Sequence, residues 1–209
     1  MASTSQDQFE VIEARPSDIE SLTTILARSF HPVNPYIRKT LPDTPAVRTW
    51  WRQLLEDQRQ NPDCHLLTAA DTATETSIGI LVLRLLGADE RGAGFWTKFD
   101  WPSDINENML QAMIDPMVEN REKFMLGRPH FLIELFGADH TWKGKGVGKA
   151  MLERACQAAD HDGHDIFVQA NASAKGFYER VGFEIIDVKV MPGEDEYTEY
   201  ALVRRHRNT

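Results

Sequence analysis

The sequence predicts one α/β (α+β) domain with a central mixed β-sheet flanked by helices. Strand-like and helix-like segments alternate along the chain. The strand-like segments alternate apolar and polar residues or are continuously apolar, and the helix-like segments have apolar residues at helical spacing. The chain shows no internal repeat, no low-complexity block and no shift in composition that would mark a linker. Its 209 residues suffice for one large buried core. We therefore expect a flexible N-terminus at 1–8 and a single domain at 9–209.

The first elements follow from simple patterns in chain order. Alternation of apolar and polar residues predicts a strand at 9–14, and apolar residues at helical spacing predict a helix at 19–30. Four prolines predict a loop at 31–45. Asp43 or Thr44 can cap the helix that follows, and an Asn-Pro pair ends it.

The middle of the chain predicts two neighbouring strands at 65–70 and 77–86, joined by a polar turn. The stretch at 87–108 is rich in glycine and aromatic residues and has no regular period. Helical spacing resumes at 109–118, and a strand follows whose core is 131–136.

The C-terminal part continues the alternation of helices and strands. The predicted elements are a helix at 147–158, a strand at 164–170, a short helix at 173–181 ended by Gly182, and strands at 183–190 and 196–204.

The composition argues against several classes of protein. A net charge of −9 disfavours nucleic-acid binding and suits a cationic partner such as an amine. No apolar run reaches the roughly 20 residues of a membrane span, and the first residues lack a secretory signal, so we expect a cytoplasmic protein without membrane contact. Cys64 and Cys156 lie far apart, and the histidines at 161–164 have no further ligand nearby, so we expect inert thiols and no metal.

One stretch, HTWKGKGVGKAML at 140–152, predicts an anion site where a helix begins. The first helical N–H groups have no intrahelical acceptor, and glycines let an anion come close to them. The Walker pattern fails at Lys143 and Ala150, and the dinucleotide pattern fails at Lys149. An acyl-CoA pyrophosphate loop remains.

With this loop, the segment from Arg128 to Val188 resembles the acyl-CoA-binding half of the GNAT superfamily of N-acetyltransferases. The family loop reads [QR]-x-x-G-x-[GA], and here lysine takes the leading position of KGKGVG at 143–148. The second family motif, N-x-x-A-x-x-x-Y followed by Gly-Phe, is matched by Asn171, Ala174, Tyr178 and Gly182-Phe183.

The resemblance implies a mostly antiparallel sheet with a V-shaped splay between its two middle strands. It implies acetyl-CoA as co-substrate, held by the half of the domain at about 128–190. Backbone amides of 145–149 would bind the pyrophosphate, and the end of the preceding strand and Asn171 would bind the pantetheine. The cofactor-binding residues so implied are Phe136, Gly137, Ala138, Lys143, Gly144, Lys145, Gly146, Val147, Gly148, Lys149, Asn171, Ala174 and Phe177.

The implied chemistry is direct attack of a free amine on the thioester, with a backbone N–H near Phe136 or Gly137 for the oxyanion. The resemblance makes Tyr178 the acid that protonates the departing thiolate. The family has no fixed base. Glu134 is the first candidate because it shares strand parity with Phe136, and Asp139 and His140 are weaker ones.

Several alternatives stay open at this point. We expect acetyl transfer to the primary amine of a small molecule by a monomer or homodimer. A protein lysine or N-terminus could instead be the acceptor, or the domain could bind acyl-CoA without catalysis or perform other CoA-linked chemistry. Many relatives read Leu-Ala-Val where this chain has Phe-Gly-Ala at 136–138, which widens the slot or repacks the core. The acceptor pocket is expected from 31–45 and 87–108, where part of the aromatic cluster at 95–101 lines it.

Overall fold

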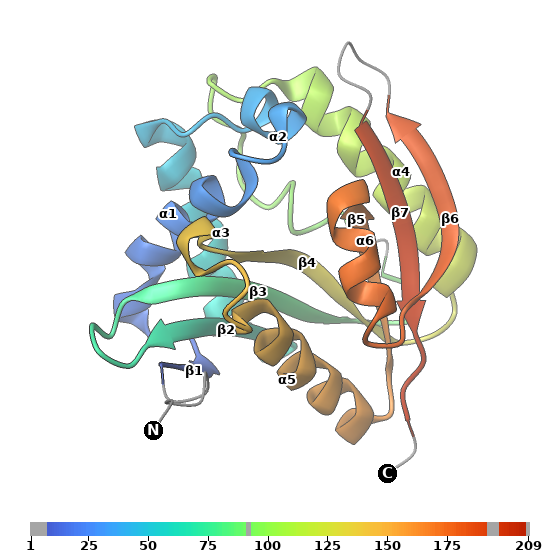
Figure 1. Cartoon of the computed structure of the whole chain (residues 1–209). Coiled ribbons are helices and arrows are strands. Elements are labelled where there is room, and N and C mark those ends of the chain that lie inside the picture. The colour runs from blue at the N-terminus through green and yellow to red at the C-terminus, as the bar shows by residue number, and fades with distance from the viewer. Residues whose placement is uncertain (1–7, 91–92, 192–196, 208–209) are drawn as a thin grey trace.

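The computed structural model describes residues 8–90, 93–191 and 197–207. Within these ranges the chain forms a seven-stranded sheet with helices on both faces (Figure 1). The strands are β1 (Phe9–Glu13), β2 (Cys64–Asp71), β3 (Ser77–Leu86), β4 (His130–Ala138), β5 (Asp165–Asn171), β6 (Glu184–Met191) and β7 (Tyr197–Arg204). The helices are α1 (Ile19–Phe30), α2 (Pro35–Thr40), α3 (Pro45–Gln60), α4 (Glu107–Met125), α5 (Val147–Asp162) and α6 (Ala172–Glu179), with short 3₁₀ turns η2 (Pro16–Asp18) and η3 (His140–Trp142).

The strands follow the order β1-β2-β3-β4-β5-β7-β6. Only β4 and β5 pair in parallel among the described strands, and every other neighbouring pair is antiparallel. A parallel pair needs a crossover, and α5 supplies it. The predicted mixed, mostly antiparallel sheet is therefore confirmed.

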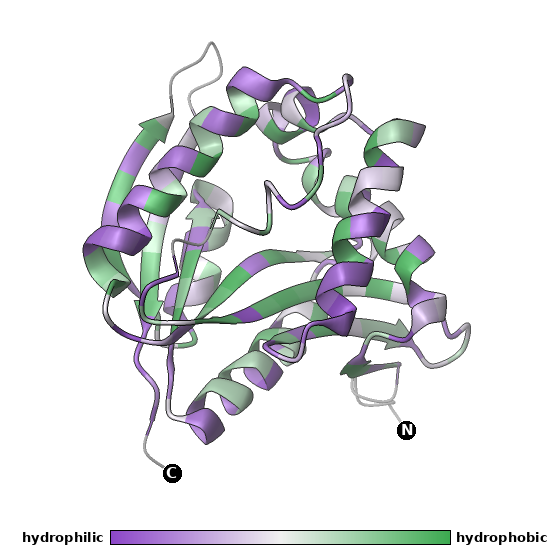
Figure 2. Cartoon of the chain, turned by 180° about the vertical axis from the view of Figure 1, so that it is seen from behind, coloured by the Kyte–Doolittle hydropathy of each residue, from purple (hydrophilic) through white to green (hydrophobic). Residues whose placement is uncertain are grey.

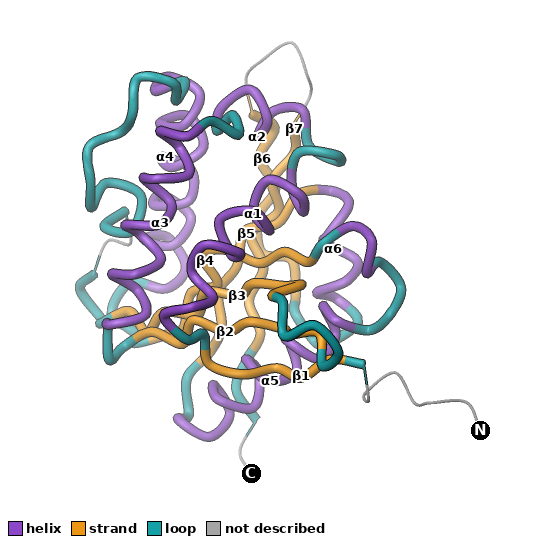
Figure 3. Tube along the Cα trace, turned by 90° about the vertical axis from the view of Figure 1, so that its left-hand side faces the viewer, coloured by secondary structure: helices purple, strands orange, loops and turns teal. Residues whose placement is uncertain are grey.

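The two middle strands separate after a short paired stretch. The pairing of β4 with β5 runs only from His130 opposite Asp165 to Ile133 opposite Val168. Beyond this point β4 continues along β3, and β5 continues along β7. Figures 1 and 3 show the opening between the two strands, which confirms the predicted splay.

A β-bulge lies where β4 leaves β5. Leu83 and Val82 of β3 pair with Ile133 and Leu135 of β4, so Glu134 is an extra residue without a partner. Such an insertion bends the strand and changes which face the following side chains occupy. Leu135 packs in the core on the α1–α4 face, whereas Phe136 packs with the core on the α5 face.

Among the described residues, three clusters of buried apolar side chains pack on the two faces of the sheet. The core beneath α1, α3 and α4 contains the fully buried Leu22, Leu54 and Phe95. The core beneath α5 and α6 contains Met151 and Leu152. Figure 2 shows the resulting pattern, with hydrophobic strands at the centre and polar residues along the helices. No described helix combines the length and the apolar character needed to cross a lipid bilayer.

The prediction that 31–45 is a loop is wrong in its middle. The Asn34 side chain accepts a hydrogen bond from the Ile37 amide, and Pro35 occupies the first turn, so the short helix α2 forms. A proline is tolerated there because the first-turn amide has no helical acceptor. Thr44, and not Asp43, caps α3. The other predicted elements are present with shifted ends, residues 1–7 of the predicted flexible segment lie outside the described residues, and so does residue 196 of the last predicted strand.

Replacing Gly137 with alanine is expected to destabilise the protein by about 1–3 kcal/mol. An added Cβ would lie 2.4 Å from Ser29 Oγ and 2.8 Å from Ser29 Cβ, so α1 must move away from β4. Gly87→Ala is the matched control because nothing lies within 4 Å of its added Cβ. Urea unfolding of both variants measures the difference, and equal midpoints would contradict the close packing of α1 on β4.

Candidate active site

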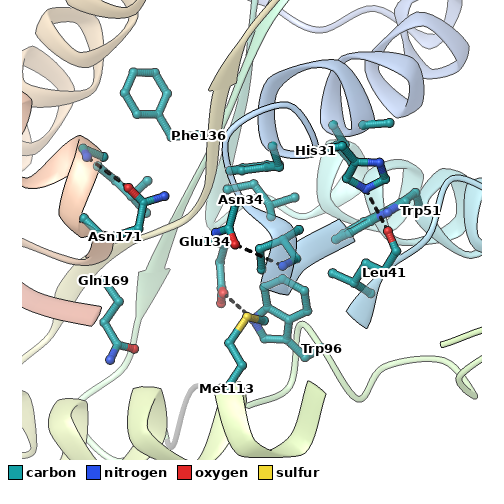
Figure 4. A pocket seen from close by; sticks show the side chains of 18 of the residues that line it. His31, Asn34, Leu41, Trp51, Trp96, Met113, Glu134, Phe136, Gln169 and Asn171 are labelled. Carbon is teal, nitrogen blue, oxygen red and sulfur yellow. Dashed lines mark hydrogen bonds between the residues drawn. The ribbon is translucent and has the colours of Figure 1, made fainter. Parts of the chain in front are cut away.

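A cavity of about 130 Å³ occupies the opening between β4 and β5. Its walls come from α1 to α4, from β4, β5 and β7, and from α6. The predicted site residues that line it are Glu134, Phe136, Asn171, Ala174 and Tyr178. Figure 4 places Asn171 on one side of this cavity and Trp96 on the other, with Glu134 between them.

The start of α5 leaves bare amides beside this opening. Gly146 is the N-cap with φ +89°, and no side chain caps the helix. The first helical hydrogen bond runs from the Ala150 amide to the Gly146 carbonyl, so the amides of Val147 to Lys149 have no helical acceptor. The Lys145 amide donates to the Trp142 carbonyl at 3.2 Å. The predicted amide cradle is therefore one residue shorter than expected and begins at Gly146.

Glycines keep the approach to these amides open. Gly144 and Gly146 have positive φ, and an added Cβ at either would meet nothing within 4 Å. A Cβ at Gly148 would contact Phe136 and Phe177 at 3.6 Å, which brings the helix start against β4 and α6. Free space in front of unpaired N–H groups fits an anionic group such as a pyrophosphate.

The lysines of the loop add positive charge at its surface. The Lys145 Nζ lies 4.2 Å from the centre of the Trp142 ring, a cation–π contact. The Lys149 Nζ lies 3.6 Å from the Glu153 carboxylate, and both side chains are exposed. Lys143 is also exposed. Lysines on flexible stems at this position can reach an anion at the helix start.

Asn171 is the N-cap of α6. Its Oδ1 accepts hydrogen bonds from the Ala174 amide at 3.0 Å and from the Ser173 hydroxyl at 2.6 Å. Within the described residues its side-chain amide nitrogen has no hydrogen-bond partner. The cap role is therefore present, and the nitrogen is left to donate into the cavity.

Tyr178 lies in an aromatic cluster on the α5 face of the sheet. Its ring packs 6.1 Å from Phe136, 5.7 Å from Phe177 and 5.3 Å from Phe183, between ring centres. Burial raises the pKa of its phenol well above the ordinary value, so the hydroxyl stays protonated at neutral pH. None of the described groups forms a hydrogen bond with this hydroxyl, which lines the cavity.

Glu134 is fully buried on the α1–α4 face. Its Oε2 accepts a hydrogen bond from Trp96 Nε1 at 3.2 Å, and its Oε1 lies 3.1 Å from the Arg84 guanidinium without hydrogen-bond alignment. Burial raises the pKa of the carboxyl to about 7, although Arg84 and the Trp96 hydrogen bond favour the charged form. At neutral pH a large fraction of this group is a carboxylate that can take a proton.

The parity argument that selected Glu134 is wrong, although the residue lies in the cavity. The bulge places the Glu134 side chain against Trp96, on the face opposite the Phe136 ring. The cavity passes through the gap in the sheet, so it contacts Glu134 on one face and Tyr178 on the other.

The two weaker base candidates lie outside this cavity. Asp139 accepts hydrogen bonds from the Thr141 amide and hydroxyl and pairs with Arg28 at 3.1 Å, which stabilises η3. Burial opposes ionisation, but the Thr141 hydrogen bonds and Arg28 together hold the pKa of this carboxyl below its usual range, so it is a poor base. His140 is exposed beside it.

Some predicted cofactor residues border the opening without lining the cavity. They are Gly137, Ala138, Phe177 and the loop at 143–149. Gly137 is packed against Ser29 of α1, so the small residue there repacks the core and does not widen the slot.

Sequence reasoning missed several residues that the fold brings to the cavity. Trp96 of the aromatic cluster lines it as expected, but Phe95 is core, and Trp101 donates to the Trp96 carbonyl. His31, Asn34 and Asp43 lie in the segment 31–45 where the acceptor pocket was expected. The polar residues that were missed are Thr23, Arg48, Gln169, Tyr197 and Glu199. Gln169 and Glu199 had one available signal, a polar residue inside a strand pattern that is otherwise largely apolar.

The splayed sheet, the bare helix start and the cavity between them have the arrangement that the resemblance to GNAT acyltransferases implies. Residues 124–194 match the family model described as the acetyltransferase (GNAT) domain. This range overlaps the segment that the two motifs identify. Over this range the chain is similar to GNAT acetyltransferases.

Solved structures confirm the fold across nearly the whole chain. An agmatine N-acetyltransferase mutant in its apo form superposes with a TM-score of 0.73 at 15% identity, covering 95% of this chain and 100% of that one. Arylalkylamine N-acetyltransferase 2 from Aedes aegypti gives 0.71 at 12% identity, with 95% and 99% covered. A polyamine N-acetyltransferase from Drosophila melanogaster gives 0.69 at 15% identity, with 94% and 99% covered. A comparison with curated protein sequences gives no match.

Replacing Gly146 with alanine is expected to weaken acetyl-CoA binding about tenfold and to destabilise the fold by about 1–2 kcal/mol. The positive φ of +89° strains any residue with a Cβ, and relief of that strain turns the bare amides away from their common direction. Gly163→Ala is the control, because Gly163 caps the other end of α5 at φ +71° with equally open space. Calorimetric titration should show weaker binding only for the Gly146 variant, and equal affinities would contradict the cradle.

Proposed function

We propose that the protein is an N-acetyltransferase that uses acetyl-CoA and acetylates the primary amine of a small molecule. The observation that carries the proposal is one cavity that reaches both Glu134 and Tyr178 through the gap in the sheet. A base and an acid on opposite sides of one reacting centre suit acyl transfer to an amine. Structural neighbours named for agmatine, polyamines and arylalkylamines support an amine acceptor.

The cofactor would lie along the residues that the motifs identify. Its pyrophosphate would rest on the amides of 146–149, with Lys143 and Lys145 nearby. The backbone of 136–138 has no partner strand on its β5 side, so alternate amides and carbonyls there are free to bind the pantetheine. Asn171 would donate to the same arm, beside Ala174 and Phe177.

The proton path follows from the two titratable residues. A protonated amine carries two protons more than its amide product needs. Glu134 accepts the first, which leaves the nitrogen free to attack, and later passes it to solvent. Tyr178 gives its own proton to the sulfur as the C–S bond breaks and the C–N bond forms, and it recovers one from the nitrogen. The bound cofactor supplies the activated acetyl group, and a free N–H of β4 near Phe136 or Gly137 stabilises the oxygen charge.

All the residues in this proposal belong to one chain, so a monomer holds a complete site and a homodimer holds two. The site needs no metal ligand, and the described residues contain no cluster that could hold a metal ion.

Two measurements test this proposal. Equilibrium dialysis with radiolabelled acetyl-CoA should show retention by the protein, and no retention at millimolar concentration would refute the proposal. A thiol-release assay over a panel of small amines should then show CoA release that depends on the amine. Retention without release indicates a binding module, release without an amine indicates other chemistry, and release only with an N-terminal or lysine peptide indicates a protein acceptor.

A further inference from the structure

We propose that Glu199 binds a second cationic group of the acceptor, so that the protein prefers elongated amines with two positive charges. This inference rests on the proposed acetyltransferase function and specifies the substrate class of the same cavity. Glu199 belongs to neither GNAT motif, and it reaches the cavity from β7.

The carboxylate of Glu199 is buried without a counter-charge. The residue is 5% exposed, and its Oε2 has no hydrogen-bond partner. Its cross-strand neighbour Lys189 is paired with Glu119 of α4 at 3.0 Å. Tyr197 hydrogen-bonds with Glu199, and this is a neutral contact. A buried carboxyl that lacks a cation either takes up a proton or pairs with a cation that a ligand brings.

Other groups in the same cavity also lack partners. Both side-chain polar atoms of Gln169 are buried without a hydrogen-bond partner, and Oε1 of Glu134 has only its ion pair with Arg84. Figure 4 shows Gln169 and Asn171 on the β5 side of the cavity. Burial raises the pKa of both carboxyls, Glu134 and Glu199, to about 7. Buried polar atoms are paired in nearly all native structures, so several unpaired atoms around one cavity indicate a polar ligand.

The rest of the cavity wall is largely apolar and fits a ligand that has an apolar chain between two polar ends. It includes Trp51, Trp96, Met113, Met117, Ile37 and Leu41. The charged residues at the outer part, Asp43 and Arg48, neutralise each other through a pair at 2.6 Å. Glu134 already faces Arg84, so Glu199 is the carboxyl of this cavity that has no cationic partner among the described residues. A monoamine that reacts beside Glu134 would leave Glu199 without one.

Glu134 and Glu199 have different partners, and from this difference we infer which one is the base and which one binds the second charge. Glu134 lies on β4 at the bulge, next to the strand that would bind the thioester, and contacts Arg84 and Trp96. Glu199 lies on β7, two strands away, and has no guanidinium partner. One amine end would lose its proton at Glu134 and react. The other end would remain charged and pair with Glu199, with Gln169 donating or accepting alongside.

The test compares acceptors of equal length that differ in one charge. Steady-state CoA release is measured with 1,5-diaminopentane and with pentylamine at saturating acetyl-CoA. The unaltered protein should have a kcat/KM about 10–100-fold higher for the diamine, the range of a hydrogen-bonded charge pair. Equal values for the two amines would overturn the inference while the proposed function stands.

Glu199→Gln keeps the shape and removes the charge. It should raise KM for the diamine about 10–100-fold and leave kcat and the pentylamine constants nearly unchanged. Glu119→Gln, an exposed carboxylate outside the cavity, is the matched control and should change neither amine. A lower kcat of Glu199→Gln with pentylamine would overturn the inference by making Glu199 a base.

Direct binding separates failure of the inference from failure of the proposed function. If no amine releases CoA, thermal melting with millimolar 1,5-diaminopentane and with pentylamine is decisive. Stabilisation of the unaltered protein by the diamine alone, lost in Glu199→Gln, supports the dicationic site without catalysis. Equal melting temperatures with both amines would overturn it.

Discussion

Replacing Glu134 with glutamine is expected to lower kcat/KM for the amine about 10²–10⁴-fold, the range that a positioned base contributes. The amide keeps the size of the side chain and can still accept the Trp96 hydrogen bond, but it cannot take a proton at neutral pH. The variant loses the proton acceptor and the charge opposite Arg84, and neither is a proposed cofactor contact, so acetyl-CoA affinity should stay nearly constant. CoA release at saturating cofactor measures the first quantity, and equilibrium dialysis measures the second.

The pH profile identifies the cause of this loss. Burial raises the pKa of Glu134 to about 7, and only the ionised form accepts a proton. Activity of the unaltered protein should therefore rise with pH through about 7 and level off above it. The Glu134→Gln variant should lack this rise in activity. Glu20→Gln, which changes an exposed carboxylate paired with Arg52, should retain it. If the activity of Glu134→Gln rises with pH in the same way, another group is the base.

Replacing Tyr178 with phenylalanine is expected to lower kcat about 10²-fold, the lower end for a positioned acid, with little change in acetyl-CoA affinity. The ring remains in its cluster with Phe136 and Phe183, so the packing is preserved and only the hydroxyl is lost. Burial raises the pKa of Tyr178, so the unaltered group is a proton donor across the neutral range. Single-turnover measurements at saturating amine isolate this step from product release.

A second tyrosine supplies the control for this prediction. Tyr200 lies on β7 outside the cavity, where Lys175 contacts its ring at 4.5 Å. Tyr200→Phe removes the same hydroxyl and should leave turnover unchanged. If both variants keep full activity, the thiolate takes its proton from another source and Tyr178 is only a packing residue.

Local patterns in the sequence predicted most of the fold because strand and helix periods depend on nearby residues. The helix at α5 and its glycine-rich start were predicted from one stretch, and the structure places bare amides there. The same local logic failed at α2. Four prolines favoured a loop at 31–45, yet Asn34 and Pro35 together form a helix start that a proline count does not reveal.

The candidate base Glu134 shows that the face on which a strand residue lies cannot always be predicted by counting along the sequence. Counting by twos along 134–136 assumes an unbroken ladder, and the assumption fails because Glu134 is the extra residue of a bulge. The residue still lies in the cavity, for a reason that the pattern did not contain: the gap between β4 and β5 opens the sheet to both faces.

By itself, the sequence determined the order of most elements, the glycine-rich start of α5 and the spacing of Asn171 and Tyr178, since each depends on residues close together in the chain. Only the tertiary structure decided which distant residues meet in the cavity. Glu134, Gln169 and Glu199 come from three different strands, and the bulge and the parting of β4 from β5 bring them to one cavity. Strand pairing over long separations and the burial of unpaired carboxylates are non-local properties, so no single stretch of the chain records them.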